Sequence, residues 1–178
     1  SMILSTFSGV SFPLIKVAEE RQVPLLLTLV ASNSAIQPDY KYTFRFFFLS
    51  NQTGVAHFDS FKGAGVKPLG IVYLNDEYGV SARDTIIENA RINKIDYVED
   101  SYNPGSNDFR SQILKIKTEN IDAVLFVTIP PSALKSFISQ ARELGVAVPI
   151  VDVGGIIPGA GGIKAVGSES EGILTSAT

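Results

Sequence analysis

LGIVYL at residues 69–74 is the stretch that decides the fold, because similar short apolar runs follow it at a regular spacing. IDYVE starts at Ile95, IDAVLFV at Ile121 and VPIVDV at Val148, so successive runs begin 26, 26 and 27 residues apart. Each run has the length and the β-branched content of a buried strand. The spacing therefore predicts βαβ units and a mainly parallel sheet.

Helical patterns fill the intervals between these runs. Apolar stripes at helical spacing are Ile86-Ile87-Ala90, then Phe109-Ile113-Ile116 after the capping candidates Ser106 to Asp108, and finally Leu134-Phe137-Ile138-Ala141-Leu144, which Gly145 should end. Right-handed crossovers place the carboxyl ends of all the strands along one edge of the sheet. Open α/β sheets bind their ligands at that edge.

The first part of the chain predicts a second, less complete α/β unit. We expect a strand end at Ile3-Leu4, a helix with Val10, Leu14, Val17 and Ala18 inward, strands at Val23–Val30 and Tyr42–Leu49, and a helix from Asn51 to Ala64. The loop Gly63–Pro68 separates that helix from the first repeated strand. Two α/β lobes joined near Leu49–Gly54 fit this pattern better than one sheet.

Composition excludes several functional classes. The 178 residues are 45% hydrophobic and 19% charged, with a net charge of −3, which predicts a buried core and gives no support to nucleic-acid binding. Zero cysteines and one histidine exclude disulfide scaffolds, thiolate metal sites and multi-histidine metal sites. No apolar run is long enough to cross a bilayer.

Catalytic and cofactor motifs are absent from the sequence. GGIIPGAGGIK at residues 154–164 lacks the Lys-Ser/Thr pair of a P-loop and the third glycine of the dinucleotide fingerprint, so we interpret it as a flexible loop. No serine lies in a G-x-S-x-G elbow. Adjacent carboxylates such as Asp76-Glu77 point apart and are interpreted as solvated faces. We predict a protein that is not an enzyme and has no cofactor or metal.

A binding edge is easier to support from the residues. Ser8-Gly9 lies between a strand end and a helix start, where free N–H groups and the helix dipole favour an anion such as a carboxylate. Other predicted strands are followed by Ser32, by Tyr78, by residues 128–131 and by residues 152–155. These residues should also lie at the carboxyl edge of a sheet. Simple N-capping is the alternative for each serine.

At these residues the sequence resembles the type I periplasmic binding proteins, and most closely their branched-chain amino acid and amide binders. The likeness is carried by SGVSFPLIKVAEERQVP (8–24), Phe44-Arg45, IVYLNDEYG (71–79), SYNPGSNDFRSQILKIKTENIDAVLF (101–126), QARELGVAVPI (140–150) and SEGIL, which begins at Ser170. It implies a three-layer αβα fold with a mainly parallel sheet, present in part, because family members are about twice this length.

The resemblance also implies how the chain is divided. Residues 1–49 would be part of lobe 1, 50–66 a crossover helix and hinge, 67–168 lobe 2, and 169–178 a strand returning toward the second hinge. Apolar faces and strand edges left by missing units could drive formation of a homodimer.

Family ligands are held by polar groups on lobe 1 and covered by lobe 2. By resemblance, Ser8 would bind a carboxylate, Val30 and Ser32 would supply a carbonyl and a hydroxyl, and Tyr78 would cover the ligand. Ala31 is the alternative to Ser32 in that register. Where the family places an acid for the ligand ammonium, this chain has Gly154, with Asp152 two residues earlier. Amino acids, amides and related small carboxylates all stay open as ligands.

The resemblance implies a periplasmic or otherwise extracytoplasmic solute-binding component of an ABC transporter, with a small-molecule ligand and a membrane permease as partners. The main alternative is a ligand-sensing domain of a receptor or transcriptional regulator with the same fold. A flavodoxin-like or other α/β enzyme is the third hypothesis. The absence of a matching P-loop or dinucleotide-binding motif argues against it.

Overall fold

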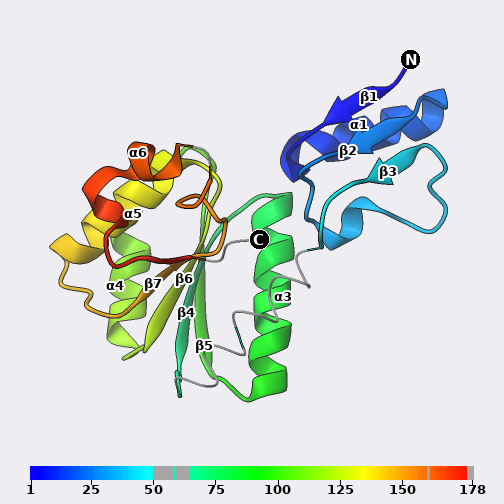
Figure 1. Ribbon diagram of the computed structural model, residues 1–178. Coiled ribbons are helices and arrows are strands. Elements are labelled where there is room, and N and C mark those ends of the chain that lie inside the picture. Colours follow the sequence, from blue (N-terminus) through cyan, green and yellow to red (C-terminus); the bar gives the residue numbers. More distant parts are fainter. Residues whose placement is uncertain (50–57, 59–64, 160, 176–178) are drawn as a thin grey trace.

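The computed structural model describes residues 1–49, 58, 65–159 and 161–175. The helix expected from Asn51 to Ala64 lies outside the described residues apart from Phe58, which is buried. Figure 1 shows two α/β units, one built from the first 49 residues and one from residue 65 onward.

The larger unit is built on a five-stranded, wholly parallel sheet, as the regular spacing of apolar runs predicted. Its strands are β4 (Leu69–Leu74), β5 (Tyr97–Tyr102), β6 (Ala123–Val127), β7 (Ile150–Asp152) and β8 (Leu174–Thr175). They are ordered β5-β4-β6-β7-β8, and every pair is parallel. The chain therefore changes direction across the sheet between β4 and β6, which is the switch point where such sheets bind ligands.

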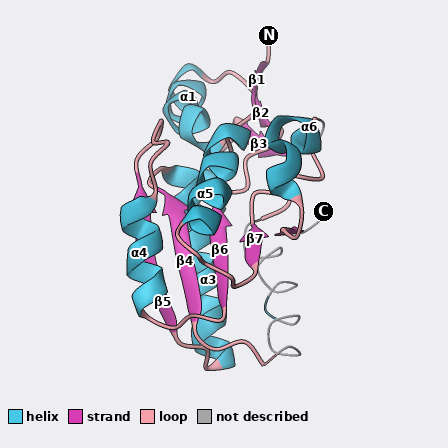
Figure 2. Cartoon of the chain, turned by 90° about the vertical axis from the view of Figure 1, so that its left-hand side faces the viewer, coloured by secondary structure: helices cyan, strands magenta, loops and turns pink. Residues whose placement is uncertain are grey.

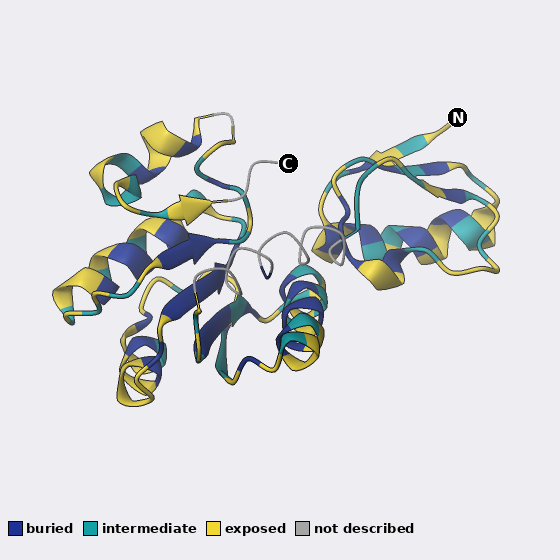
Figure 3. Cartoon of the chain, turned by 60° about the horizontal axis from the view of Figure 1, so that its bottom comes forward, coloured by how far each residue is buried: buried dark blue, intermediate teal, exposed yellow. Residues whose placement is uncertain are grey.

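Helices cover both faces of this sheet and make three layers, as predicted (Figure 2). They are α3 (Glu77–Asn93), α4 (Arg110–Thr118), α5 (Pro131–Glu143) and α6 (Gly162–Val166). The buried stripe of α3 packs on one sheet face with Ile71 and Leu125. On the other face, α4 and α5 pack against Phe126. Figure 3 shows the buried sides of these helices turned toward the strands.

The smaller unit has three short parallel strands in the order β1-β2-β3, with bounds Ile3–Ser5, Leu25–Leu27 and Thr43–Arg45. The strands predicted at Val23–Val30 and Tyr42–Leu49 were too long. Val30 is buried beyond the end of β2, in the core with helix α1 (Ser8–Arg21), whereas Leu29 is 46% exposed. The predicted strands were too long because the apolar run continues past the end of the strand into residues that are not part of the sheet.

The inward face of α1 agrees with the prediction at Ala18, which is buried, and at Leu14, which packs against the core, and differs from it at the two valines. Val10 and Val17 are 60% and 46% exposed, whereas the buried positions are Ser8, Ser11, Ile15 and Ala18. Ser11 can be buried because its hydroxyl contacts the Ser5 hydroxyl at 2.8 Å and donates to the Phe7 carbonyl at 2.8 Å. The periodicity of apolar residues alone could not identify a buried face made partly of serine.

The face of the small sheet that points away from α1 is apolar. The strand register places Leu4, Leu26 and Phe44 side by side. Leu4 is 62% exposed and Phe44 is 55% exposed. An exposed apolar face of this kind is what the homodimer prediction requires, and the homodimer itself stays a prediction.

The glycine-rich stretch at residues 154–164, interpreted from sequence as a flexible loop, contains the start of α6. A side chain could not be accommodated at Gly162, because an added Cβ would lie 1.8 Å from the Ile156 carbonyl oxygen. Gly162 therefore serves close backbone packing, and so does Gly154, where an added Cβ would lie 2.1 Å from the Thr128 carbonyl oxygen, whereas Gly161 has open space and a positive φ of 80°. Among the described residues, no helix has the length and apolar character needed to cross a membrane.

Candidate ligand-binding site

The first turns of α3 meet the first unit directly. The Asn33 backbone N–H donates to Ser81 Oγ at 3.2 Å, and Asn33 Nδ2 donates to Thr85 Oγ1 at 3.4 Å. A Cβ added to Gly9 would lie 3.6 Å from Asp76 Oδ2. We call the region formed by these five residues the lobe junction. It joins the start of α1 and the short helix η1 (Asn33–Ala35) to the carboxyl end of β4 and the start of α3.

Ser8 begins α1 beside this junction. Its side chain is 2% exposed, and its hydroxyl has no hydrogen-bond partner among the described residues. Phe7, the N-cap residue, provides no side-chain cap, and the first turn contains no acidic residue. A buried hydroxyl at an uncapped helix N-terminus is suited to donate to an anionic group that the dipole also attracts.

Val30 and Ser32 are fixed differently from Ser8. The side chain of Val30 is buried in the core of the first unit. The Ser32 carbonyl accepts from Arg45 Nη1 at 2.7 Å, and its hydroxyl contacts the Ser34 hydroxyl at 3.0 Å. Burial lowers the pKa of the Arg45 guanidinium. Both polar groups of Ser32 already have partners, so a ligand would compete with these bonds.

Tyr78 lies in the first turn of α3 and is half-buried. Burial raises the pKa of its phenol, and the negative charges of Asp152 and Asp76 raise it further. The phenol is therefore a neutral hydrogen-bond donor across the physiological range. Gly79 holds this turn against β4, because an added Cβ there would lie 1.8 Å from the Leu74 carbonyl oxygen.

Asp152 ends β7 and is fully buried. Its Oδ2 accepts from the Ile157 N–H at 2.8 Å and from the Thr175 hydroxyl at 3.3 Å, whereas Oδ1 has no partner among the described residues. Burial raises the pKa of this carboxyl, and the N–H groups of the following loop oppose that effect. One oxygen of Asp152 thus holds the loop, and the other is left to accept a hydrogen bond.

Thr128 adds a third unsatisfied group at the end of β6. Its buried hydroxyl has no hydrogen bond among the described residues, although it lies near the Tyr102 hydroxyl, which instead donates to the Val127 carbonyl at 3.4 Å. Buried polar atoms without partners are uncommon in folded proteins and call for an explanation. All three such atoms among the described residues follow or end strands of the two sheets.

Asp76 is a residue that the sequence analysis missed as part of the site. We interpreted it as solvated, but it is half-buried and its Oδ1 accepts from the Gly79 N–H at 2.8 Å, capping α3. An aspartate just after a strand and just before a helical stripe is a recognised capping signal and could have identified it. No sequence signal identifies the Asn33 contacts, because 48 residues separate Asn33 from Ser81.

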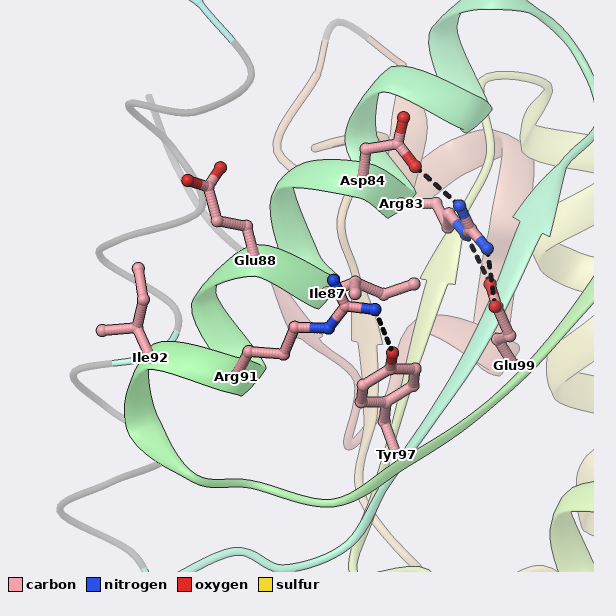
Figure 4. Close-up of a pocket in the computed structure, with 8 residues that line it drawn as sticks. All are labelled: Arg83, Asp84, Ile87, Glu88, Arg91, Ile92, Tyr97 and Glu99. Atoms are coloured by element: carbon pink, nitrogen blue, oxygen red, sulfur yellow. Dashed lines mark hydrogen bonds and ion pairs between the residues drawn. The ribbon is translucent and has the colours of Figure 1, made fainter.

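The predicted residues are therefore brought together only in part. Ser8 lies beside the junction, and Tyr78 lies within electrostatic reach of both Asp76 and Asp152. The side chain of Val30 lies in the core of the first unit, and the ligand role of its carbonyl stays a prediction. A separate hollow of about 380 Å³ between α3 and β5 includes none of the predicted residues (Figure 4). Its Arg83 already pairs with Asp84 and Glu99, and its Arg91 donates to the Tyr97 hydroxyl.

Two parallel α/β units that meet at the carboxyl ends of their strands, with unsatisfied buried polar groups there, are typical of bilobal binding proteins. The family model described as periplasmic binding protein matches residues 1–178. The chain belongs to the periplasmic binding protein family.

Solved structures of similar fold agree with this assignment. A leucine-binding protein from Thermotoga maritima has a TM-score of 0.87 at 23% identity, over 98% of this chain and 50% of its own. An extracellular ligand-binding receptor from Rhodopseudomonas palustris has a TM-score of 0.85 at 21% identity, over 96% and 48%. A solute-binding protein from R. palustris in complex with benzoate has a TM-score of 0.82 at 20% identity, over 98% and 48%.

These likenesses establish the type I periplasmic binding fold, and the chain spans about half the length of the structures that it matches. No curated protein sequence matches the chain. The resemblance inferred from sequence motifs is thus confirmed for family and fold, and the roles of individual residues stay predictions.

Proposed function

We propose that the protein containing this chain is the solute-binding component of an ABC transporter and takes an amino acid, an amide or a related small carboxylate at the lobe junction. Ser8 and the N-terminus of α1 bind the carboxylate of the solute, and Tyr78 covers the solute. From the second lobe, Asp152 accepts a hydrogen bond from the solute, and the Thr128 hydroxyl donates or accepts one. Binding draws the two lobes together and shifts the population toward a closed state.

The observation that supports this proposal best is the Ser8 hydroxyl, which is buried and unpartnered at an uncapped helix N-terminus. Leaving such a group unsatisfied costs free energy, and an anionic ligand would recover it. The fold neighbours fit this class of ligand, since one is named as a leucine-binding protein and another is in complex with benzoate.

Thermal unfolding of the complete gene product with amino acids, their amides and small carboxylates tests the proposal. A ligand present at a hundred times its Kd should add about 2.7 kcal/mol to the free energy of unfolding. We expect at least one of these solutes to stabilise the protein strongly. Stabilisation by nucleotides or flavins, with none by these solutes, would contradict the proposal.

We further propose an extracytoplasmic location and a membrane permease as the partner of the closed form. Cell fractionation checks the first, and solute-dependent co-purification with the permease checks the second. The apolar sheet face of Leu4 and Phe44 supports the homodimer expected from sequence, and sedimentation of the chain tests it.

A further inference from the structure

Asp76 is an acidic residue of the lobe junction that takes no part in the ligand contacts of the proposed function. Asp76 uses Oδ1 to cap α3, whereas its Oδ2 makes no hydrogen bond within the described part of the chain. That second oxygen faces the first turn of α1, since a Cβ on Gly9 would lie 3.6 Å from it. A carboxylate of one lobe therefore faces the positive end of a helix in the other.

The same turn of α1 is where the solute carboxylate is proposed to bind. Ser8, next to Gly9, supplies the buried and unpartnered hydroxyl. A solute carboxylate there would lie close to the negative charge of Asp76, and like charges at such short range repel. Among the described residues, no salt bridge pairs Asp76 with a lysine or an arginine.

We propose that Asp76 is a specificity-determining residue that selects solutes carrying a positive charge or a proton donor next to their carboxylate. Such a donor would lie between the solute carboxylate and Asp76 Oδ2 and would satisfy both. A zwitterion such as an α-amino acid meets this requirement, and a plain monocarboxylate does not. The proposal rests on the proposed function. It also supplies the acidic partner for an ammonium that the sequence lacks at Gly154.

Paired probes that differ only in the ammonium group test this directly. Calorimetry on the complete gene product would compare leucine with 4-methylpentanoate, and phenylalanine with 3-phenylpropanoate. In Asp76→Asn the amide oxygen can still accept from the Gly79 N–H, so the cap is kept while the charge is lost. We expect the unmodified protein to prefer the amino acid of a pair, and Asp76→Asn to reduce that preference roughly tenfold or more.

Glu77→Gln is the matched control. Glu77 is exposed, adjacent to Asp76 and in the first turn of the same helix, so the variant makes the same change in net charge. Its preference ratio should equal that of the unmodified protein. Asp76→Ser keeps a capping hydroxyl and provides the measurement if Asp76→Asn does not fold.

The possible outcomes separate the two proposals. An unchanged ratio in the Asp76 variants, or a wild-type preference for the acid without the ammonium, overturns the role of Asp76 and leaves the proposed function standing. Failure of the unmodified protein to bind any amino acid, amide or carboxylate contradicts the proposed function itself, and the role of Asp76 falls with it.

Discussion

The Ser8 hydroxyl allows ligand binding and stability to be separated at a single residue. Because it is buried without a partner, Ser8→Ala removes an unsatisfied group and should leave the free energy of unfolding unchanged or raise it by up to about 1 kcal/mol. A hydrogen bond to a charged ligand contributes about 1.5–3 kcal/mol, so solute affinity should fall roughly tenfold or more. Denaturant titration and calorimetry measure the two effects.

Ser11→Ala is the matched control for this prediction, one turn further along α1. The Ser11 hydroxyl is fully paired with Ser5 and with the Phe7 carbonyl, and its loss leaves the buried Ser5 hydroxyl without that bond. It should lower stability by about 1–3 kcal/mol and leave affinity nearly unchanged. A large stability loss in Ser8→Ala with no change in affinity would assign Ser8 to the fold alone.

Side chains whose neighbours come from distant segments were beyond the reach of sequence patterns. Ser8 was predicted as a ligand residue from its place between a strand and a helix, and the structure adds that its hydroxyl is unpartnered. The capping role of Asp76 could have been predicted from its place before a helical stripe, but its approach to α1 depends on how the two lobes meet, which no local spacing encodes. Local chemistry therefore indicated Ser8, and only the assembled chain places Asp76 opposite it.

At the scale of elements, the Glu19 carboxylate ties α1 to the start of β3. It accepts from the Lys41 N–H at 2.9 Å, the Tyr42 N–H at 3.0 Å and the Thr43 hydroxyl at 2.7 Å. Although burial alone would raise its pKa, these hydrogen bonds outweigh that effect and the pKa of Glu19 is lowered. A carboxyl whose pKa is lower in the folded state than in the unfolded state stabilises the fold only while it is ionised.

The contribution of Glu19 to the free energy of unfolding decreases as the pH falls. The contribution of Glu19 is fully present above its ordinary pKa of 4.5 and is lost as the pH falls through the lower folded-state value. Glu19→Gln should therefore reduce the free energy of unfolding near neutral pH and converge with the unmodified protein in acid. Denaturant titrations between about pH 3 and pH 7 measure this.

Glu20→Gln serves as the comparison, since Glu20 is exposed and, within the described part of the chain, pairs only with Lys16 at 4.0 Å. Exposed pairs of this kind contribute little, so its stability curve should follow that of the unmodified protein at every pH. A Glu19→Gln curve that stays parallel to the unmodified one down to the lowest pH would show that the carboxylate does not hold α1.

The regular elements of the second unit were predictable because its central strands β4, β6 and β7 are buried on both faces. Leu69–Leu74 is the observed β4, and Ala123–Val127 lies within the predicted IDAVLFV run. In the first unit the strands are three residues long, so apolar residues in loops and polar residues in the core carry as much of the packing as the strands do. A two-residue period has too few repeats there to locate the strand ends.

At the scale of the whole molecule, few direct bonds join the lobes among the described residues, and Asn33 makes two of them. Its N–H and its side-chain amide donate to Ser81 and Thr85 of α3. Ser81 lies in the second turn of that helix and Thr85 near its middle, whereas Tyr78 lies in its first turn and Asp76 is its N-cap. Asn33 is thus placed to stabilise the arrangement in which the two strand edges face each other.

Asn33→Ala should therefore favour a more open arrangement of the lobes. Loss of the side-chain bond, and weakening of the backbone bond at an exposed site, should shift the closing equilibrium by about 1 kcal/mol, or roughly fivefold. A larger radius of gyration in solution scattering and faster amide exchange in the first turns of α3 would measure this. Gln37→Ala is the control, because Gln37 Nε2 donates to the Ser34 carbonyl at 3.0 Å within its own lobe. If both variants have the same radius of gyration as the unmodified protein, the Asn33 hydrogen bonds form as a result of lobe closure and do not stabilise the closed arrangement.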